Sequence, residues 1–297
     1  MDQASLYHNR QGHLRLDAGD TEGALAEFTA ACEGDPENVG FRTSKIRCLM
    51  EMHEKGKALS EALILYQARP NSVEAALMVF ELQEQNGLHY EALETIERMI
   101  ENEPQDPELH WKKADFYSRH ENESAALSET EYCISLDPEN PRYQVAKAET
   151  LLALDRKQDA LDCYDKLIGI DPVNPDTYYD KGNLLADMGR TEEAERCYRK
   201  IADLRPHQIN SFQVLAQFYE TEDRYDDALD CYRTMISLNP RKPQLYFDRA
   251  SILEGLGRYE ECLADYRKAT ELDPHNPEFR LSLESAIRKG RSENSSH

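Results

Sequence analysis

Several patterns that identify enzymes, metal proteins and membrane proteins are missing from this sequence. It contains no G-x-S-x-G, no Walker loop and no G-x-G-x-x-G, so the common nucleophile and nucleotide-binding motifs are absent. Its seven cysteines form no C-x-x-C pair, and no Cys/His run has the spacing of a zinc site. No apolar run approaches the roughly 18 residues that a membrane span requires. We therefore predict no catalytic site, no cofactor, no metal ion and no membrane association.

Basic residues are also scarce relative to acidic ones. The chain has 35 Lys and Arg against 57 Asp and Glu, which gives a formal net charge of -22. Such a surface opposes binding to nucleic-acid phosphates, which requires clustered Lys and Arg, and it suits basic or neutral protein partners. The first residues, MDQASLYHNR, lack the basic and apolar regions of a signal peptide. We expect a soluble, cytoplasmic protein that does not bind nucleic acid.

What the sequence does contain is one pattern repeated every 34 residues. An alanine recurs at this interval seven times, and a cysteine takes its place in the last repeat. A proline recurs twelve residues after each of them, so eight ungapped units run from Ser5 to Asn276. The recurring residues are Ala24, Ala58, Ala92, Ala126, Ala160, Ala194, Ala228 and Cys262, followed by Pro36, Pro70, Pro104, Pro138, Pro172, Pro206, Pro240 and Pro274.

Each unit is predicted to form two amphipathic helices. In residues 175–208, Tyr178 and Gly182 lie four apart on one face of the first helix, and Ala194 and Tyr198 do so on the second. The small residues let the two helices approach closely, and the aromatic ones fill the space beside them. One such hairpin cannot bury its apolar faces alone, so it needs neighbours of the same kind.

The joints between units carry signals that end one helix and begin the next. In the stretch DPENP, Pro138 cannot continue a helix, Asn140 can cap the following helix, and Pro141 fits at its first position. Gly189 marks the tight turn inside a unit.

With this period and this order of Gly, Tyr, Ala, aromatic residue and Pro, the chain resembles the tetratricopeptide repeat (TPR) family over more than nine-tenths of its length. The resemblance implies an all-α fold, a right-handed superhelical solenoid of antiparallel helix pairs. The expected parts are a lead-in at 1–4, repeats at 5–38, 39–72, 73–106, 107–140, 141–174, 175–208, 209–242 and 243–276, a capping helix at 277–290, and a flexible tail at 291–297.

The cysteines and histidines are predicted to be structural. Cys163, Cys197 and Cys231 lie one period apart, at the same place in three successive second helices, so duplication of a packing position explains their spacing. His89 and His120 fall at or beside turns, where we expect them to be exposed to solvent.

The resemblance also implies a binding surface. In TPR proteins the first helices line a concave groove that binds peptides, and places 2, 5, 9 and 12 of each unit face it, with Ser5 or Pro175 as place 1. A simpler interpretation remains open, in which place 5 packs between neighbouring first helices and the acids at place 9 are merely solvated. The partner-binding residues that the resemblance implies are Leu77, Trp111, Val145 and Tyr179 at place 5, and Glu81, Asp115, Glu149 and Asn183 at place 9.

Trp111 is the predicted centre of this groove. It is the only tryptophan, and its unit has His110, not Trp111, at the usual aromatic place 4. Tryptophan is among the residues that most often contribute large binding energies at interfaces. The acidic residues beside it favour a cationic partner with apolar anchors. Place 5 never holds Lys, so a clamp for C-terminal carboxylates of the kind found in some TPR proteins is not expected.

We therefore expect a non-enzymatic adaptor that binds a partner protein or peptide in its groove. One alternative is a structural protein that forms homo-oligomers, with its solenoids stacked end to end or through residues 39–72. That repeat is the only one with net positive charge, six basic against three acidic residues, and it is also a candidate for a separate binding site. Another alternative is an accessory subunit of an enzyme encoded elsewhere.

Overall fold

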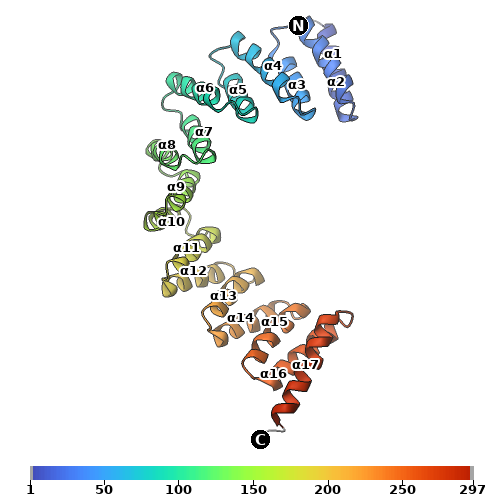
Figure 1. Ribbon diagram of the computed structural model, residues 1–297, viewed down its shortest axis with the longest axis vertical. Helices are drawn as coiled ribbons and strands as arrows, with labels where there is room; N and C mark the ends of the chain where they lie inside the picture. Colours follow the sequence, from blue (N-terminus) through green and yellow to red (C-terminus); the bar gives the residue numbers. More distant parts are fainter. Residues whose placement is uncertain (1–2, 295–297) are drawn as a thin grey trace. The chain divides into compact units, whose positions relative to one another are not determined.

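The computed structural model describes residues 3–294, with side chains as far as Gly290, and every regular element in this range is an α-helix (Figure 1). The helices are α1 (Gln3–Asp17), α2 (Thr21–Gly34), α3 (Val39–Glu51), α4 (Lys55–Ala68), α5 (Val73–Gln85), α6 (His89–Asn102), α7 (Pro107–Arg119), α8 (Glu123–Leu136), α9 (Pro141–Ala153), α10 (Lys157–Ile170), α11 (Pro175–Asp187), α12 (Thr191–Leu204), α13 (Ile209–Thr221), α14 (Tyr225–Leu238), α15 (Pro243–Gly255), α16 (Tyr259–Leu272) and α17 (Pro277–Asn294).

The helices follow the predicted 34-residue units. In every unit after the first, a first helix begins at place 1 and a second helix begins at place 17. The predicted all-α architecture of tandem helix pairs is thereby confirmed. Two boundaries differ from the expected ones: α1 already begins at Gln3, and α17 continues to Asn294 instead of ending at residue 290. Residues 1–2 and 295–297, which belong to the expected lead-in and tail, lie outside the described part of the chain.

The joints between units have the capping geometry that the sequence indicates. The side chain of Asn140 accepts a hydrogen bond from the backbone N–H of Arg142 at 3.2 Å, and Pro141 occupies the first helical position between them. Asn174 and Pro175 begin α11 in the same way. Each asparagine satisfies one of the N–H groups that a helix start leaves without a partner.

The turn inside each unit needs a positive φ at place 15. Glycine supplies it in four units, including Gly189 with φ of 70°. The other four units use His53, Glu121, Asp155 and Asp223, whose φ values lie between 55° and 59°. A side chain in this left-handed region costs roughly 1–2 kcal/mol, so the stacking of the helices must hold these turns in place.

Close approach of the two helices relies on a small residue at place 20 in every unit and at place 8 in six of the eight, whereas Ile46 and Phe80 occupy place 8 in units two and three. A Cβ atom built on Gly182 would lie 2.9 Å from Cε1 of Tyr198, and one on Gly12 would lie 2.5 Å from Cε1 of Phe28. The alanine at place 20 is completely or almost completely buried in all seven units that have it. The aromatic ring at place 24 thus fills the space that the missing side chain leaves.

The helices form two compact bodies, the N-terminal body up to Leu154 and the C-terminal body from Asp155 onwards. A core in the N-terminal body extends from α3 to α7 and includes Ile46, Phe80 and Phe116. In the C-terminal body, Tyr266 and Ala286 belong to a core formed by α14 to α17. None of the helices in residues 3–294 has the length and hydropathy needed to span a membrane.

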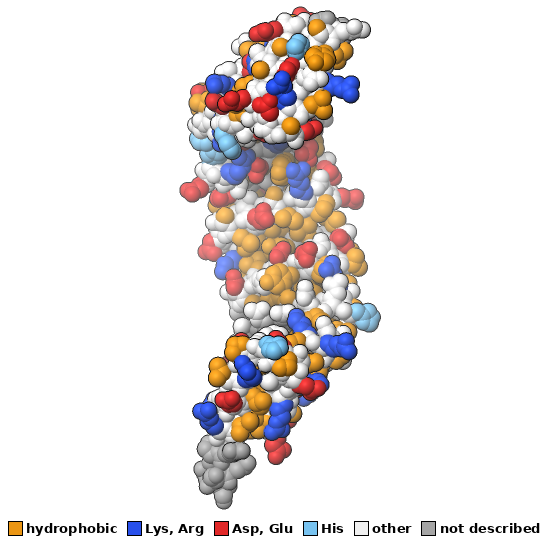
Figure 2. Space-filling view, turned by 90° about the vertical axis from the view of Figure 1, so that its right-hand side faces the viewer, with side chains coloured by type: hydrophobic (Ala, Val, Ile, Leu, Met, Phe, Trp, Pro, Cys, Tyr) orange, Lys and Arg blue, Asp and Glu red, His pale blue; other side chains and the backbone are white. Residues whose placement is uncertain are grey.

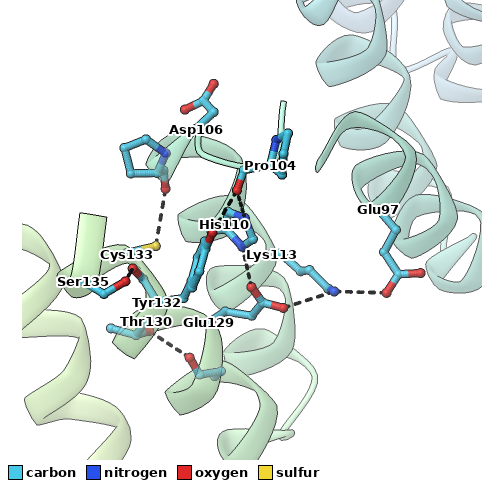
Figure 3. Close-up of polar contacts among 12 residues, drawn as sticks. Glu97, Pro104, Asp106, His110, Lys113, Glu129, Thr130, Tyr132, Cys133 and Ser135 are labelled. Atoms are coloured by element: carbon cyan, nitrogen blue, oxygen red, sulfur yellow. Dashed lines mark hydrogen bonds and ion pairs between the residues drawn. The ribbon is translucent and has the colours of Figure 1, made fainter. Parts of the chain in front are cut away.

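A polar contact ties each of several units to the one before it. In Figure 3, His110 at place 4 of α7 lies between two acceptors, with Nδ1 2.7 Å from Glu129 and Nε2 3.2 Å from the carbonyl oxygen of Pro104. The hydroxyl groups of Tyr178 and Tyr246, at the same place, donate to the prolines that end their preceding units. His110 therefore performs the structural task of the usual place-4 aromatic residue.

Candidate functional site

The predicted groove residues of the N-terminal body lie on its first helices, α5, α7 and α9. Leu77 is partly buried and packs against the core, whereas Val145 is 41% exposed. Trp111 is half-buried. The space-filling view shows hydrophobic side chains interspersed with charged ones across one face of the molecule (Figure 2). Place 5 of the N-terminal body therefore holds one residue that packs against the core, Leu77, and two that are partly exposed, Trp111 and Val145.

The face of the Trp111 ring is occupied by a residue that the sequence reasoning missed. The guanidinium carbon of Arg142, in α9, lies 3.4 Å from the ring centroid, a cation–π contact. Arg142 also forms an ion pair with Glu108 at 3.1 Å. One observation could have revealed this residue, because Arg142 is the only basic residue at place 2 of any unit.

The acids that were expected beside Trp111 are mostly paired with bases of the same body. Lys112 lies 3.3 Å from Glu81, and Arg119 lies 2.9 Å from Asp115. Glu149 is exposed and has no ion-pair partner among the described residues. The negative potential of this face is therefore weaker than the sequence pattern indicates. That pattern took account of the acids at place 9 and not of the bases at places 6 and 13, Lys112 and Arg119.

In the C-terminal body, the two remaining predicted residues line a hollow of about 200 Å³. Tyr179 and Asn183, in α11, form one wall, and α13 supplies the other. The hydroxyl group of Tyr198 donates to the Asn183 side chain at 2.8 Å, and Tyr179 packs edge-on against the Tyr198 ring. The hollow is thus lined by aromatic rings together with polar side chains, among them the amides of Asn183 and Gln217. Its residues are Tyr179, Asn183, Ala186, Tyr198, Val214, Gln217, Phe218 and Thr221.

Three carboxylates of the C-terminal body lie in surroundings that disfavour their ionised form. Burial raises the pKa of Glu220, in α13, and the nearby charge of Asp248 raises it further, although Tyr232 donates a hydrogen bond at 3.1 Å. Burial also raises the pKa of Asp180 and of Asp248. None of the three forms an ion pair with another described residue, so the body carries unneutralised negative charge close to α11 and α13.

The cysteines provide no site. All seven are free and buried, and burial raises the pKa of Cys133, Cys231 and Cys262 to about 12. The prediction that Cys163, Cys197 and Cys231 are packing positions is confirmed by their burial. Within the described residues, no group of three or more His, Cys, Asp or Glu side chains could hold a metal ion.

One of the two turn histidines departs from the expected exposure. His89 is exposed, but His120 is half-buried and its ring stacks on Phe116 with centroids 4.3 Å apart. His120 Nε2 also lies 2.8 Å from Nδ1 of His89. The expectation was wrong for His120, because the turn at the end of α7 packs against the turn that begins α6.

Comparison with known proteins agrees with the repeat pattern. Tetratricopeptide repeat family models match residues 141–174, 175–208 and 215–284. No curated protein sequence matches the chain.

Solved structures with some likeness include three repeat proteins. The crystal structure of MamA is 20% identical with a TM-score of 0.45, and the alignment covers 56% of this chain and 97% of that one. YrrB, described as a TPR protein with an unusual peptide-binding site, is 16% identical with a TM-score of 0.44, over 64% of this chain and 96% of that one. A tetratricopeptide repeat protein from Parabacteroides merdae ATCC 43184 is 15% identical with a TM-score of 0.43, over 96% and 100% of the two chains. None of these is similar enough to add to the family matches.

The family matches cover repeats five and six and most of the two that follow. The same helix pair, in the same 34-residue register and with the same buried alanine, is present in the four repeats before them. The chain therefore contains tetratricopeptide repeats between residues 141 and 284, and the helix pairs before them follow the same pattern.

Proposed function

We propose that this protein is a non-enzymatic scaffold that holds a segment of a partner protein against the inner faces of its first helices. Its tetratricopeptide repeats support a role in protein–protein interaction. One observation carries the finer proposal: the half-buried carboxylates of Glu220 and Asp248 form no ion pair with another described residue, and Glu220 lies on α13, which lines an open hollow with aromatic walls. A cationic side chain of the partner would relieve the cost of burying them.

The partner segment is proposed to alternate apolar residues with Lys or Arg. Tyr179 and the hollow beside it would accept an apolar anchor. The contact of Arg142 with Trp111 and Glu108 shows the chemistry that the other body offers, an aromatic face next to a carboxylate. A basic side chain of the partner would take the place of Arg142 on that ring.

Eight of the proposed contact residues are those that the sequence indicates, and the carboxylates of Glu220 and Asp248 are added to them. They lie in two sets, one in each body, and each set is proposed to contact the partner independently. The N-terminal body contributes Leu77, Glu81, Trp111, Asp115, Val145 and Glu149, and the C-terminal body contributes Tyr179 and Asn183 together with Glu220 and Asp248.

The test begins with capture of the partner on the full chain, identification by mass spectrometry, and synthesis of the bound segment. Calorimetric titration should then show that Tyr179→Ala and Trp111→Ala each weaken binding by at least about 2 kcal/mol, with unchanged helical content. Tyr90→Ala is the matched control, because Tyr90 lies on the second helix α6 and is 79% exposed. It should bind as tightly as the parent chain.

A further variant tests the contact residues of the N-terminal body by themselves. Arg142→Gln frees the Trp111 ring, so it should tighten binding of a basic segment if the ring is a contact. The proposal fails if both Tyr179→Ala and Trp111→Ala bind the captured segment as tightly as the parent does.

A further inference from the structure

The outer face of α1, which is separate from the proposed groove, carries exposed apolar residues at places that are buried in every other unit. Place 3 and place 10 of units two to eight and of α17 are 8% exposed or less, except for the half-buried Ile252. In α1 the same places hold Tyr7, 61% exposed, and Leu14, 55% exposed. The buried residues are Phe41, Ala75, Leu109, Tyr143, Thr177, Ser211, Leu245 and Phe279 at place 3, and Cys48, Leu82, Phe116, Thr150, Leu184, Phe218 and Ala286 at place 10.

The other units show what normally covers these two places. Phe41 packs with Ala31 and Cys32 of α2, so place 3 rests on the second helix of the preceding unit. Cys48 packs with Ala24 and Phe28 of the same helix, so place 10 does too. Repetition of this joint along the chain makes a second helix the natural occupant of the α1 face.

The α1 face is not the polar surface that normally closes a solenoid. Two large apolar side chains, Tyr7 and Leu14, are more than half exposed on it. The ring of Tyr7 lies edge-on to the ring of His8, in its own helix. By contrast, the exposed surface of α17 includes the charged residues Arg280, Glu284 and Arg288.

The charge of the α1 face sets a second requirement for the helix pair that docks on it. Arg10, at place 6 between Tyr7 and Leu14, is exposed and forms no ion pair with another described residue. In unit four, Lys112 at place 6 lies 3.3 Å from Glu81, which occupies place 9 of the preceding first helix. A helix pair that docks on α1 would therefore be matched best if it carries an acid at place 9.

We infer that the α1 face is a docking site for a TPR-type helix pair of another protein. Its second helix covers Tyr7 and Leu14 as α2 covers Phe41 and Cys48, and an acid of its first helix pairs with Arg10. A second copy of this chain does not supply such a surface, because each of its second helices is already covered by the first helix that follows.

The chain itself provides the probe. Ending it at Asn276 removes α17, and with it Phe279 and Ala286, and leaves the second helix α16 uncovered. Tyr7→Glu and Leu14→Glu in this shortened chain prevent it from binding itself. Mixed with the full chain, the probe should form a 1:1 complex by sedimentation velocity. The complex should be absent when the full chain also carries Tyr7→Glu and Leu14→Glu.

Charge variants of the probe test the second requirement. Ser251 is exposed and occupies place 9 of the unit that contains α16. Ser251→Glu in the probe should lower the dissociation constant about threefold, as expected for a surface ion pair, and Ser251→Lys should raise it by about as much. With Arg10→Glu in the full chain, the Ser251→Lys probe should have the lower dissociation constant and the Ser251→Glu probe the higher one.

Three results would overturn the inference. One is the absence of a complex when the probe is folded and helical. If removal of α17 unfolds α16, a probe ending at Lys242 exposes α14 and serves for the same test. Another is a full chain that dimerises alone and becomes monomeric with Tyr7→Glu, because the occupant would then be a second copy. The third is a fall in the urea midpoint of full-chain Tyr7→Gln/Leu14→Gln, because the two residues would then pack within the chain. An unchanged midpoint supports a free face.

Discussion

At the scale of single residues, the joint inside each unit leaves no room for a larger side chain. Gly182 faces the Tyr198 ring, and Ala194 is completely buried between the two helices. Both positions were identified from the sequence, because they recur at fixed places of the repeat. At place 20 the recurrence reflects a steric limit that every hairpin shares, whereas place 8 accepts Ile46 and Phe80 in units two and three.

Replacing Ala194 with Leu should overpack this joint and lower the free energy of unfolding by roughly 1–3 kcal/mol. Urea denaturation followed by circular dichroism measures the change. Ala18→Leu is the control, because Ala18 is exposed at the end of α1 and should change stability little. Equal stability of Ala194→Leu and the parent would contradict the repeat register.

The buried thiols should be unreactive in the folded chain. Burial raises the pKa of Cys231 to about 12 and also raises that of Cys197, so the reactive thiolate is scarce near neutral pH. All seven cysteines should react slowly with a thiol reagent in buffer and quickly in denaturant. Because the pKa of these thiols is higher in the folded chain than in the unfolded chain, the stability that they contribute depends on pH. It is intact below the ordinary thiol pKa and is lost as pH rises towards 12. Fast labelling of Cys163, Cys197 and Cys231 in buffer would disprove the packing role.

At the scale of helices, the last four units share an arginine at place 16, where each second helix begins. Arg224 donates to Asp227 of its own helix at 2.8 Å and also pairs with Glu195 of the preceding second helix. Arg258 bridges to Asp226 of its preceding helix in a similar way. The first four units have Asp20, Glu54, Leu88 and Asn122 at this place, so their second helices are joined differently.

Arg224→Gln should lower stability near neutral pH by about 0.5–1 kcal/mol, because it removes a partly exposed ion-pair network. The hydrogen bond from Arg224 lowers the pKa of Glu195, so this stability is present above the ordinary glutamate pKa and is lost as pH falls through the lowered value. The difference between variant and parent should shrink on acidification. Arg196→Gln, with Arg196 exposed and 3.9 Å from Glu193, is the control and should have little effect at any pH.

Most helix boundaries could be predicted, because Asn and Pro mark them chemically. The left-handed turn at Glu121 could not, since glutamate rarely adopts a positive φ and the packed helices impose it. The end of α17 at Asn294 was missed for a different reason. No proline follows residue 290, where the expected helix ended, and α17 continues past it.

At the scale of the molecule, the charge of the chain should make partner binding depend on pH. Burial raises the pKa of Glu220, so a larger fraction of this carboxylate is protonated just above the ordinary glutamate pKa. A cationic guest binds the ionised form. Affinity for the captured segment should therefore rise as pH increases through this range, and Glu220→Gln should flatten the profile. A pH-independent affinity in the parent chain would exclude Glu220 as a contact.

The candidate site could be predicted only in part, because a repeat places side chains on a face without stating which of them pair. Trp111 and Tyr179 share place 5, yet Trp111 is covered by Arg142 and Tyr179 borders an open hollow. The difference arises from residues in neighbouring helices, such as the single arginine at place 2. Ion pairs between units follow from side-chain reach in three dimensions, which the 34-residue pattern does not encode.

The unbroken register also has a consequence for how the length of this chain can vary. Deletion of residues 209–242 joins α12 directly to α15, and Arg258 would then meet Glu192, an acid at the same place 18 as its present partner Asp226. The shortened chain should keep its helical content per residue and unfold cooperatively, as measured by circular dichroism. Deletion of residues 213–242 removes four residues fewer, leaves residues 209–212 between α12 and α15, and should weaken the joint between these two helices. Insertions and deletions are therefore tolerated in steps of one whole repeat, which makes length a discrete, heritable variable of this protein.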